Sequence, residues 1–142
     1  MKAANSRYGR CMYFASNTLA RKTEKLANAV WKKVDLSPSH AYLLMIVLEE
    51  PRVQPGPLRQ ELHLTPSTIT RQVEKREDKK LVVRTTEDKT TSIYHTAKSK
   101  EMKPFLHECV DDFYKNCTAL VGKHECNRFV NSMNKIPDKL VS

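Results

Sequence analysis

The sequence contains little glycine and no long hydrophobic run. Only three of its 142 residues are glycine, too few for a glycine-rich phosphate-binding loop or a flexible linker. The longest uninterrupted apolar run, residues 41–48, has eight residues, whereas a helix that crosses a bilayer needs about 20. Residues 1–7 also lack the apolar segment of a secretory signal. We therefore expect a cytoplasmic protein that has no membrane partner.

Cysteine is sparse as well. The four cysteines, Cys11, Cys109, Cys117 and Cys126, are too scattered for the dense disulfide framework of a small secreted domain. Because there is no export signal, we expect reduced thiols. The sequence also shows no serine–histidine–aspartate arrangement and no conspicuous carboxylate pair for acid–base chemistry. We therefore predict a protein that is not an enzyme and needs no cofactor.

Acidic residues are the minority among the charged ones. Twenty-five lysine and arginine residues face sixteen aspartate and glutamate residues, which gives a net charge of +9. Such an excess attracts polyanions, nucleic acid first and anionic membranes second. Residues 1–34 carry eight basic residues and only one acidic residue, Glu24. This region is either a source of phosphate contacts or a solvated basic helix face, and charge alone does not decide between them.

Hydrophobic residues recur at helical spacing through most of the chain. Ser37-Pro38 and Thr65-Pro66 each combine a good N-cap residue with proline at the first helical position, which is a strong helix start. The helix that follows Ser37 is apolar nearly all round, so it should be the most buried one. The proline-rich residues 51–57 are expected to form a rigid connection. The predicted helices cover residues 6–34, 38–50, 58–64, 66–79 and 97–121, and a last helix ends at Pro137.

Two segments rich in Val, Ile, Thr and Tyr carry the only convincing β-strand signal. Residues 81–86 and 91–95 flank a charged tip at 87–90, a pattern typical of a two-stranded hairpin. Two helices joined by a tight turn and followed by a hairpin are the order of a winged helix-turn-helix. We therefore predict a mainly α-helical fold with a small β-hairpin wing. It forms a single domain over residues 1–142, with a winged helix-turn-helix lobe at 36–99.

The predicted helix over 66–79 has the chemistry of a DNA-recognition helix. A helix fits the major groove of B-DNA, and its first turn presents free backbone N–H groups to phosphates and base edges. Three hydroxyl side chains in that turn can also donate hydrogen bonds, those of Ser67, Thr68 and Thr70. Arg71 can bind guanine with two hydrogen bonds. Lys89, at the hairpin tip, can extend into the adjacent minor groove.

These residues resemble the recognition segment of the multiple-antibiotic-resistance regulator (MarR) family. Residues 58–71 read LRQELHLTPSTITR, which is similar to the family's L-A-x-x-L-G-L-S-P-S-T-V-T-R. Upstream, residues 36–50 resemble its L-T-x-x-Q-W-x-V-L helix. Downstream, Leu81-Val82, Asp88-Lys89 and His95-Thr96 resemble the family's wing landmarks L-V, D-R and L-T. The order and spacing agree over residues 36–99.

The resemblance implies a homodimer built from helices in residues 5–34 and 100–141. Its two recognition helices would enter successive major grooves of a pseudo-palindromic operator in double-stranded DNA. The implied function is sequence-specific transcriptional regulation, by a ligand- or stress-responsive repressor associated with the bacterial nucleoid. In relatives a small aromatic or other effector binds between the dimer helices and the DNA-binding lobe. The residues that would line this pocket are Trp31, His40, Tyr42 and Met45.

Twelve residues are predicted to contact DNA, on the recognition helix, on the wing and at the starts of neighbouring helices. They are Ser37, Ser39, Gln54, Pro66, Ser67, Thr68, Thr70, Arg71, Gln72, Lys75, Arg84 and Lys89. Winged helices also serve as protein-binding surfaces. An interaction module with only non-specific DNA affinity is therefore the alternative.

The chain departs from the family pattern at several positions. His63, Lys80 and Ser99 stand where the family has glycine, and Lys89 replaces the wing arginine. Lysine keeps the charge but loses the bidentate geometry. Arg76 stands where leucine is usual, on the inward stripe of the recognition helix. We expect its stem to be packed and its guanidinium group to reach the surface.

Cys11 raises the question of a thiol sensor. Peroxide-sensing relatives carry a cysteine early in the first helix, and Arg7 and Arg10 lie close to Cys11 in the sequence. Nearby cations favour the reactive thiolate. Counting back from Leu36, however, Cys11 lies about two residues earlier than the sensing cysteine, on another face of the helix. We therefore favour a structural or idle thiol.

A repeated tripeptide raises the question of a metal site. His107-Glu108-Cys109 recurs as His124-Glu125-Cys126, and imidazole with thiolate suits zinc. On a helix, however, residues two apart diverge by about 200°. Each pair therefore cannot converge on one ion, and no metal site is predicted.

Overall fold

The computed structural model describes residues 1–140, which form six α-helices and one β-hairpin. The α-helices are α1 (Met12–Trp31), α2 (Pro38–Glu49), α3 (Pro55–Leu62), α4 (Pro66–Asp78), α5 (Ala97–Val121) and α6 (Lys123–Lys135). Short 3-10 helices are η1 (Ala3–Asn5), η2 (Lys32–Val34) and η3 (Pro137–Lys139). Strands β1 (Val82–Glu87) and β2 (Thr90–His95) pair antiparallel, with Val82 opposite His95. The predicted fold class, mainly α-helical with a small hairpin wing, is confirmed.

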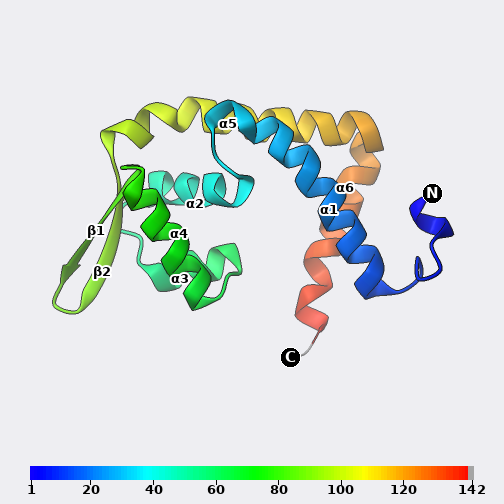
Figure 1. Cartoon of the computed structure of the whole chain (residues 1–142), viewed down its shortest axis with the longest axis horizontal. Coiled ribbons are helices and arrows are strands. Elements are labelled where there is room, and N and C mark those ends of the chain that lie inside the picture. Colours follow the sequence, from blue (N-terminus) through cyan, green and yellow to red (C-terminus); the bar gives the residue numbers. More distant parts are fainter. Residues whose placement is uncertain (141–142) are drawn as a thin grey trace.

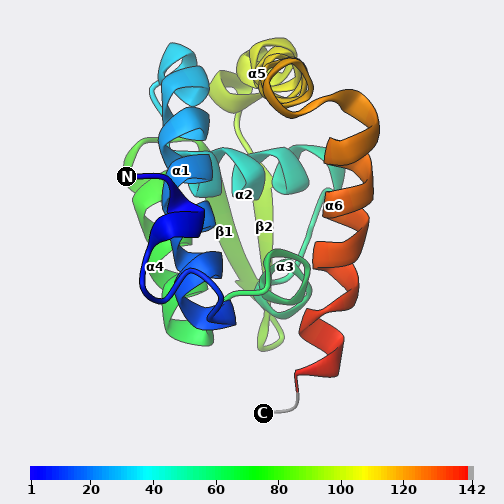
Figure 2. The ribbon, with the colours of Figure 1, turned by 90° about the vertical axis from the view of Figure 1, so that its right-hand side faces the viewer.

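These elements lie on two sides of the molecule (Figure 1). Helix α5 runs along the top. Helices α2, α3 and α4 and the hairpin lie beneath one end of it, whereas α1 and α6 descend toward the other. Figure 2 shows the hairpin in the middle of the view, with α1 and α6 on either side. Helix α5 therefore connects the winged-helix lobe, residues 38–95, to the helices near the chain ends.

Helix α2 is the centre of the hydrophobic core. Six of its residues are buried, namely Ala41, Leu43, Leu44, Met45, Val47 and Leu48. They pack with Trp31 from α1, Ile93 from β2, and Leu106 and Cys109 from α5. Burying one large apolar side chain contributes about 1.5–3 kcal/mol, so α2 fixes the lobe against α5. Although α2 is so apolar, no helix within residues 1–140 combines the length and hydropathy needed to span a membrane.

Helix α1 begins at Met12 and not at residue 6 as predicted. The preceding residues form tight turns, in which the Gly9 N–H donates to the Ser6 carbonyl and the Cys11 N–H to the Tyr8 carbonyl. Gly9 sits so close to η1 that an added Cβ would lie 2.9 Å from the Ala3 carbonyl oxygen. This close approach requires glycine and ends the helical path toward the N-terminus.

The connection between α2 and α3 also differs from the prediction. Residues 55–57 were expected to link the two helices, but α3 already starts at Pro55. Proline is tolerated there because the first N–H groups of a helix have no partner within it. The true connection contains Val53, whose carbonyl accepts a hydrogen bond from the Ile93 N–H at 2.9 Å. This single bridge adds a third segment to the edge of the hairpin.

The turn at the wing tip contains two residues, whereas four were predicted. Glu87 and Thr90, expected in the tip, are paired with each other in the ladder. Asp88 and Lys89 make the turn, with φ angles of 48° and 66°. Positive φ at both central positions is the geometry of the tight hairpin turns that match strand twist. The wing therefore presents Lys89 at its outermost point.

The Thr96 hydroxyl lies between β2 and α5 and bonds to the segment that follows α4, so its loss should affect stability. It donates to the Lys80 carbonyl at 2.8 Å and accepts from the Ser99 N–H at 3.2 Å. The substitution Thr96→Val keeps the shape but removes both bonds, and should lower the free energy of unfolding by about 1–3 kcal/mol. Urea denaturation measures this. Thr86→Val, which removes an exposed threonine pair on the wing, is the control. Equal losses in both variants would contradict the assigned role.

Candidate nucleic-acid interface

The turn between α3 and α4 sets the direction of the recognition helix. His63 ends α3 in the left-handed region, with φ 54°, so histidine adopts the conformation that glycine would adopt most easily. The Arg59 guanidinium donates to the Leu64 carbonyl across this turn at 3.3 Å. Thr65 then caps α4, because its hydroxyl accepts from the Thr68 N–H. The helix start predicted at Thr65 and Pro66 is confirmed.

One face of α4 holds it on the lobe, and the opposite face is open. Ile69 and Val73 are buried, as is Leu58 on α3. On the outward side, Pro66, Ser67, Thr70 and Arg71 are exposed. Within the described residues Arg71 forms no ion pair. The first turn of α4 therefore presents hydroxyl groups and an unpaired guanidinium group to solvent.

The wing reaches the same edge of the molecule as this first turn. Figures 1 and 2 both place the hairpin tip and the start of α4 at the lower edge. Lys89 is exposed at that tip. The basic residues of the N-terminal region lie elsewhere, since η1 and the start of α1 are at the opposite end of the molecule from the wing (Figure 1). Within one chain, α4 and the wing therefore supply cationic side chains to this edge that the N-terminal segment does not.

Arg84, also predicted to contact DNA, is not free. Its guanidinium lies 2.6 Å from the Glu77 carboxylate of α4. This hydrogen bond raises the pKa of Arg84 above its ordinary value. In this state Arg84 ties β1 to α4, and a contact with a phosphate would require breaking the ion pair.

The remaining predicted contacts divide into exposed and half-buried residues. Ser37, Ser39 and Gln54 are exposed at or beside the starts of α2 and α3. Lys75 is exposed one turn after Arg71. Thr68 is half-buried and shares the cap with the Thr65 hydroxyl at 2.8 Å. Gln72 is half-buried, and its side-chain oxygen is buried without a partner among residues 1–140.

Arg76 corrects the expectation that its charged group reaches the surface. Its side chain is only 2% exposed. The Nε and Nη1 atoms have no hydrogen-bond partner within residues 1–140. Burial lowers the pKa of Arg76, and the adjacent inward positions are the apolar Ile69 and Val73. The helix turns Arg76 inward with them, and its side chain does not extend past the core edge.

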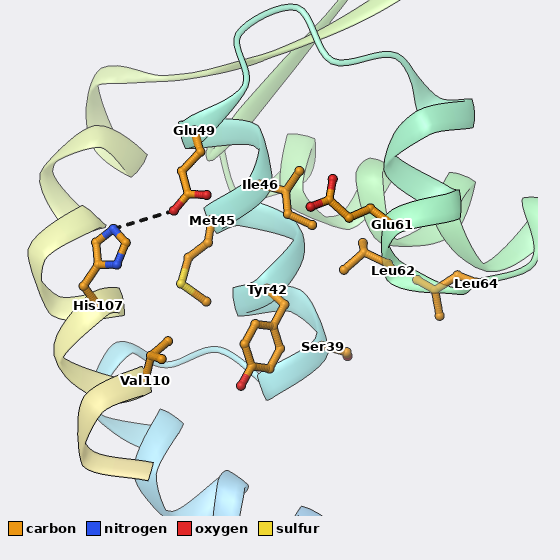
Figure 3. Close-up of a pocket in the computed structure, with 10 residues that line it drawn as sticks. All are labelled: Ser39, Tyr42, Met45, Ile46, Glu49, Glu61, Leu62, Leu64, His107 and Val110. Atoms are coloured by element: carbon orange, nitrogen blue, oxygen red, sulfur yellow. Dashed lines mark ion pairs between the residues drawn. The ribbon is translucent and has the colours of Figure 1, made fainter. Parts of the chain in front are cut away.

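A cavity of about 620 Å³ lies between α2, α3 and α5 (Figure 3). Tyr42 and Met45 line it, as predicted for an effector pocket. Trp31 and His40 do not. Trp31 is fully buried in the core, with its ring centroid 5.5 Å from that of Tyr42. His40 faces α4 instead, and its pKa is lowered by burial and by the nearby cations Arg76, Lys75 and Lys79.

Three charged or titratable residues of this cavity were missed by the sequence analysis. Glu49, Glu61 and His107 come from three different helices. Glu49 and His107 approach to 4.0 Å. Burial raises the pKa of the Tyr42 hydroxyl. Because these residues are far apart in the sequence and form no motif, only the fold brings them together.

The cysteines differ in their exposure. Cys11 is exposed at the start of α1, whereas Cys109 is buried and its thiol lies 3.8 Å from the Val30 carbonyl. Burial raises the pKa of the Cys109 and Cys117 thiols, which disfavours their thiolate forms. Among residues 1–140, no group of three or more His, Cys, Asp or Glu side chains is placed to hold a metal ion.

Replacing Arg76 by leucine tests its buried state. Arg76→Leu removes a desolvated guanidinium from an apolar site and should raise the free energy of unfolding by about 1–4 kcal/mol. Arg71→Leu, on the exposed face of the same helix, is the matched control and should change stability little. Thermal and urea denaturation measure both. A loss of stability in Arg76→Leu would mean that the guanidinium has a partner in the native protein.

Releasing Arg84 tests the role of its ion pair. Glu77→Gln should free the guanidinium for a phosphate, so the dependence of log K on log salt should steepen by about 0.9 for random duplex DNA. Glu74→Gln removes the same charge from α4 but leaves the Arg84 pair intact, which makes it the control. Binding at several salt concentrations gives both slopes. Identical slopes would show that Arg84 does not reach the backbone of DNA.

The comparisons with known proteins agree with this geometry. Residues 34–90 match the sequence model of the MarR family. No curated protein is a significant match to the sequence.

Solved structures match over nearly the whole chain. The repressor CouR of Rhodococcus jostii RHA1, bound to a 23-mer DNA duplex, has a TM-score of 0.83 and 14% identity over 96% of this chain and 98% of that chain. CouR bound to p-coumaroyl-CoA gives 0.85 at the same identity and coverage. A mutant of MarR from E. coli complexed with operator DNA gives 0.79 and 14% identity over 93% and 99%.

At such low identities, the structural matches establish the fold. The family match covers the part of the chain that contains α2, α3, α4 and most of the hairpin. Residues 34–90 therefore match the MarR family, and nearly the whole chain shares its fold with the transcriptional repressor CouR and with MarR.

Proposed function

We propose that this protein is a sequence-specific regulator of transcription that binds double-stranded DNA as a homodimer. The observation that carries the proposal is the shared edge formed by the first turn of α4 and the wing tip. Exposed Ser67, Thr70 and Arg71 and the tip residue Lys89 all belong to this edge. The N-terminal part of an α-helix fits the major groove of B-DNA, while a lysine at the wing tip would reach the neighbouring DNA backbone or minor groove.

A second copy of the chain is needed to cover the terminal helices. No residue of α6 is buried in the single chain. Large apolar side chains are exposed on α1, on the end of α5 and on α6, among them Met12, Leu19, Leu120, Val121, Phe129, Val130 and Met133. Exposed apolar side chains gathered on the terminal helices are typical of an interaction site. A two-fold dimer covers it with the same surface of a second copy.

Dimerisation would also supply the geometry of operator recognition. Two-fold related recognition helices match half-sites that are separated by one helical turn, about 34–36 Å. Base-edge contacts from Arg71 would provide specificity, and contacts from lysines and hydroxyl groups to phosphates would position the protein. In this proposal the protein acts on the bacterial nucleoid, as a repressor whose operator it leaves when an effector binds.

The effector would act through the cavity between the lobe and α5. CouR has been solved with DNA and with p-coumaroyl-CoA, so one protein of this fold binds both kinds of ligand. In the present chain, the cavity is lined by α2 and α3 of the lobe and by α5. A ligand that binds more tightly to one lobe orientation would shift the spacing of the recognition helices.

The Arg71→Ala variant tests the proposal. Affinity is measured for DNA that flanks the gene of this protein and for random DNA of equal length. The difference in binding free energy between the two DNAs should fall by about 1–3 kcal/mol, because a base contact is lost. Lys103→Ala, an exposed change on α5, controls for the loss of one charge. Equal weakening on both DNAs would make Arg71 a phosphate contact. No preference in the parent protein would favour a protein-interaction module.

A further inference from the structure

The cavity between α2, α3 and α5 has a charge opposite to that of the whole protein. The chain carries 25 lysine and arginine residues, yet none of them lines this cavity. Its charged or titratable side chains are Glu49, Glu61 and His107. Two carboxylates outweigh one histidine whether or not the imidazole is protonated. The cavity is therefore a local anionic site on a cationic molecule.

The two carboxylates come from different helices of the lobe. Glu49 is at the end of α2 and pairs loosely with His107 of α5, at 4.0 Å between Oε1 and Nε2. Glu61 is on α3 and has no ion-pair partner among the described residues. Figure 3 shows the Glu49 carboxylate turned toward His107 of α5 and the Glu61 carboxylate on the α3 side, with Ile46 between them. Among residues 1–140, neither carboxylate forms an ion pair with a lysine or arginine.

The rest of the lining is apolar and includes an aromatic ring. Met45, Ile46, Leu62, Leu64 and Val110 supply most of the surface. The Tyr42 ring is held edge-to-face against the buried Trp31, with an interplanar angle of 65°, and remains 40% exposed toward the cavity. Aromatic faces attract organic cations as well as apolar groups. A volume of about 620 Å³ is also within the range of small-molecule sites.

We propose that this cavity binds an organic cation that has an apolar or aromatic body. The body would fill the space beside Tyr42 and Met45, and its positive charge would lie toward Glu49 and Glu61. A carboxylate or phosphate ligand would meet two negative charges and no lysine or arginine in the lining. The assignment of this ligand as the effector rests on the proposed function, but the binding itself does not depend on DNA.

A bound cation would affect how the lobe is oriented relative to α5. The two carboxylates, Glu49 and Glu61, belong to the lobe, whereas the opposite wall of the cavity belongs to α5. Met45 and Glu61 are on α2 and α3, whereas His107 and Val110 are on α5. A ligand that contacts both walls stabilises one orientation of the lobe relative to α5. A cation near Glu49 would also compete with His107 for that carboxylate.

Two probes of nearly equal shape and opposite charge test the proposal. Tetraphenylphosphonium and tetraphenylborate are titrated separately into the full-length protein by calorimetry, at about 0.15 M salt to screen the surface charge. The net charge of +9 favours the anion at long range, so a preference for the cation must come from a local site. We expect the phosphonium to bind at least about tenfold more tightly than the borate, a difference of about 1.4 kcal/mol.

Variants locate the binding. Glu49→Gln combined with Glu61→Gln should weaken the binding of the phosphonium by about tenfold or more, while borate binding stays unchanged or becomes tighter. Glu101→Gln, an exposed glutamate on α5 outside the cavity, should bind the cation like the parent protein. Circular dichroism confirms that the double variant is folded.

Three results would overturn the proposal. These are equal or tighter binding of the borate by the parent protein, unchanged phosphonium binding in the folded double variant, and binding of neither probe. If neither probe binds and the double variant changes the oligomeric state, a second copy of the chain occupies the cavity. A gel shift distinguishes failure of the proposed function from failure of the ligand assignment. If the protein binds the cation but shows no preference for operator DNA, the ligand assignment stands and the ligand has no regulatory role.

Discussion

The burial of α2 is the constraint on which the rest of the structure depends. Its apolar side chains contact α1, α3, α5 and the hairpin, so one helix holds together elements from both ends of the chain. Trp31 from α1 and Leu106 from α5 both pack in this core, so the lobe has a defined position beneath α5. The orientation of α4, the reach of the wing and the shape of the cavity all follow from that packing.

The same packing leaves two surfaces without partners. The terminal helices bury little of their apolar surface, whereas the α4–wing edge is polar, carries Arg71 and Lys89, and projects away from the core. An apolar face favours association with protein, and a cationic edge favours association with DNA. This division of chemistry supports the proposal that one end of the molecule dimerises while the other binds the operator. Helix α5 connects them, with the anionic cavity beneath it.

Local signals were enough to predict most of the fold. Thr65 and Pro66 predicted the start of α4, and the Val- and Thr-rich segments predicted the hairpin, because caps, prolines and β-branched residues act over a few neighbouring positions. The start of α1 depends on contacts of Gly9 with η1, which periodicity does not encode. Arg76 was placed wrongly because a long polar side chain is buried or extends according to tertiary packing. Glu49, Glu61 and His107 form one cavity only after folding.

The central claim is sequence-specific DNA binding, and a gel-shift titration tests it most directly. The protein is titrated against DNA that flanks its own gene and against random DNA of the same length, at about 50 and about 200 mM salt. The account predicts a preference of at least about 10³ for the flanking DNA, which persists at the higher salt concentration. Equal and steeply salt-dependent binding to both DNAs would contradict it, because the net charge of +9 would then account for all of the affinity.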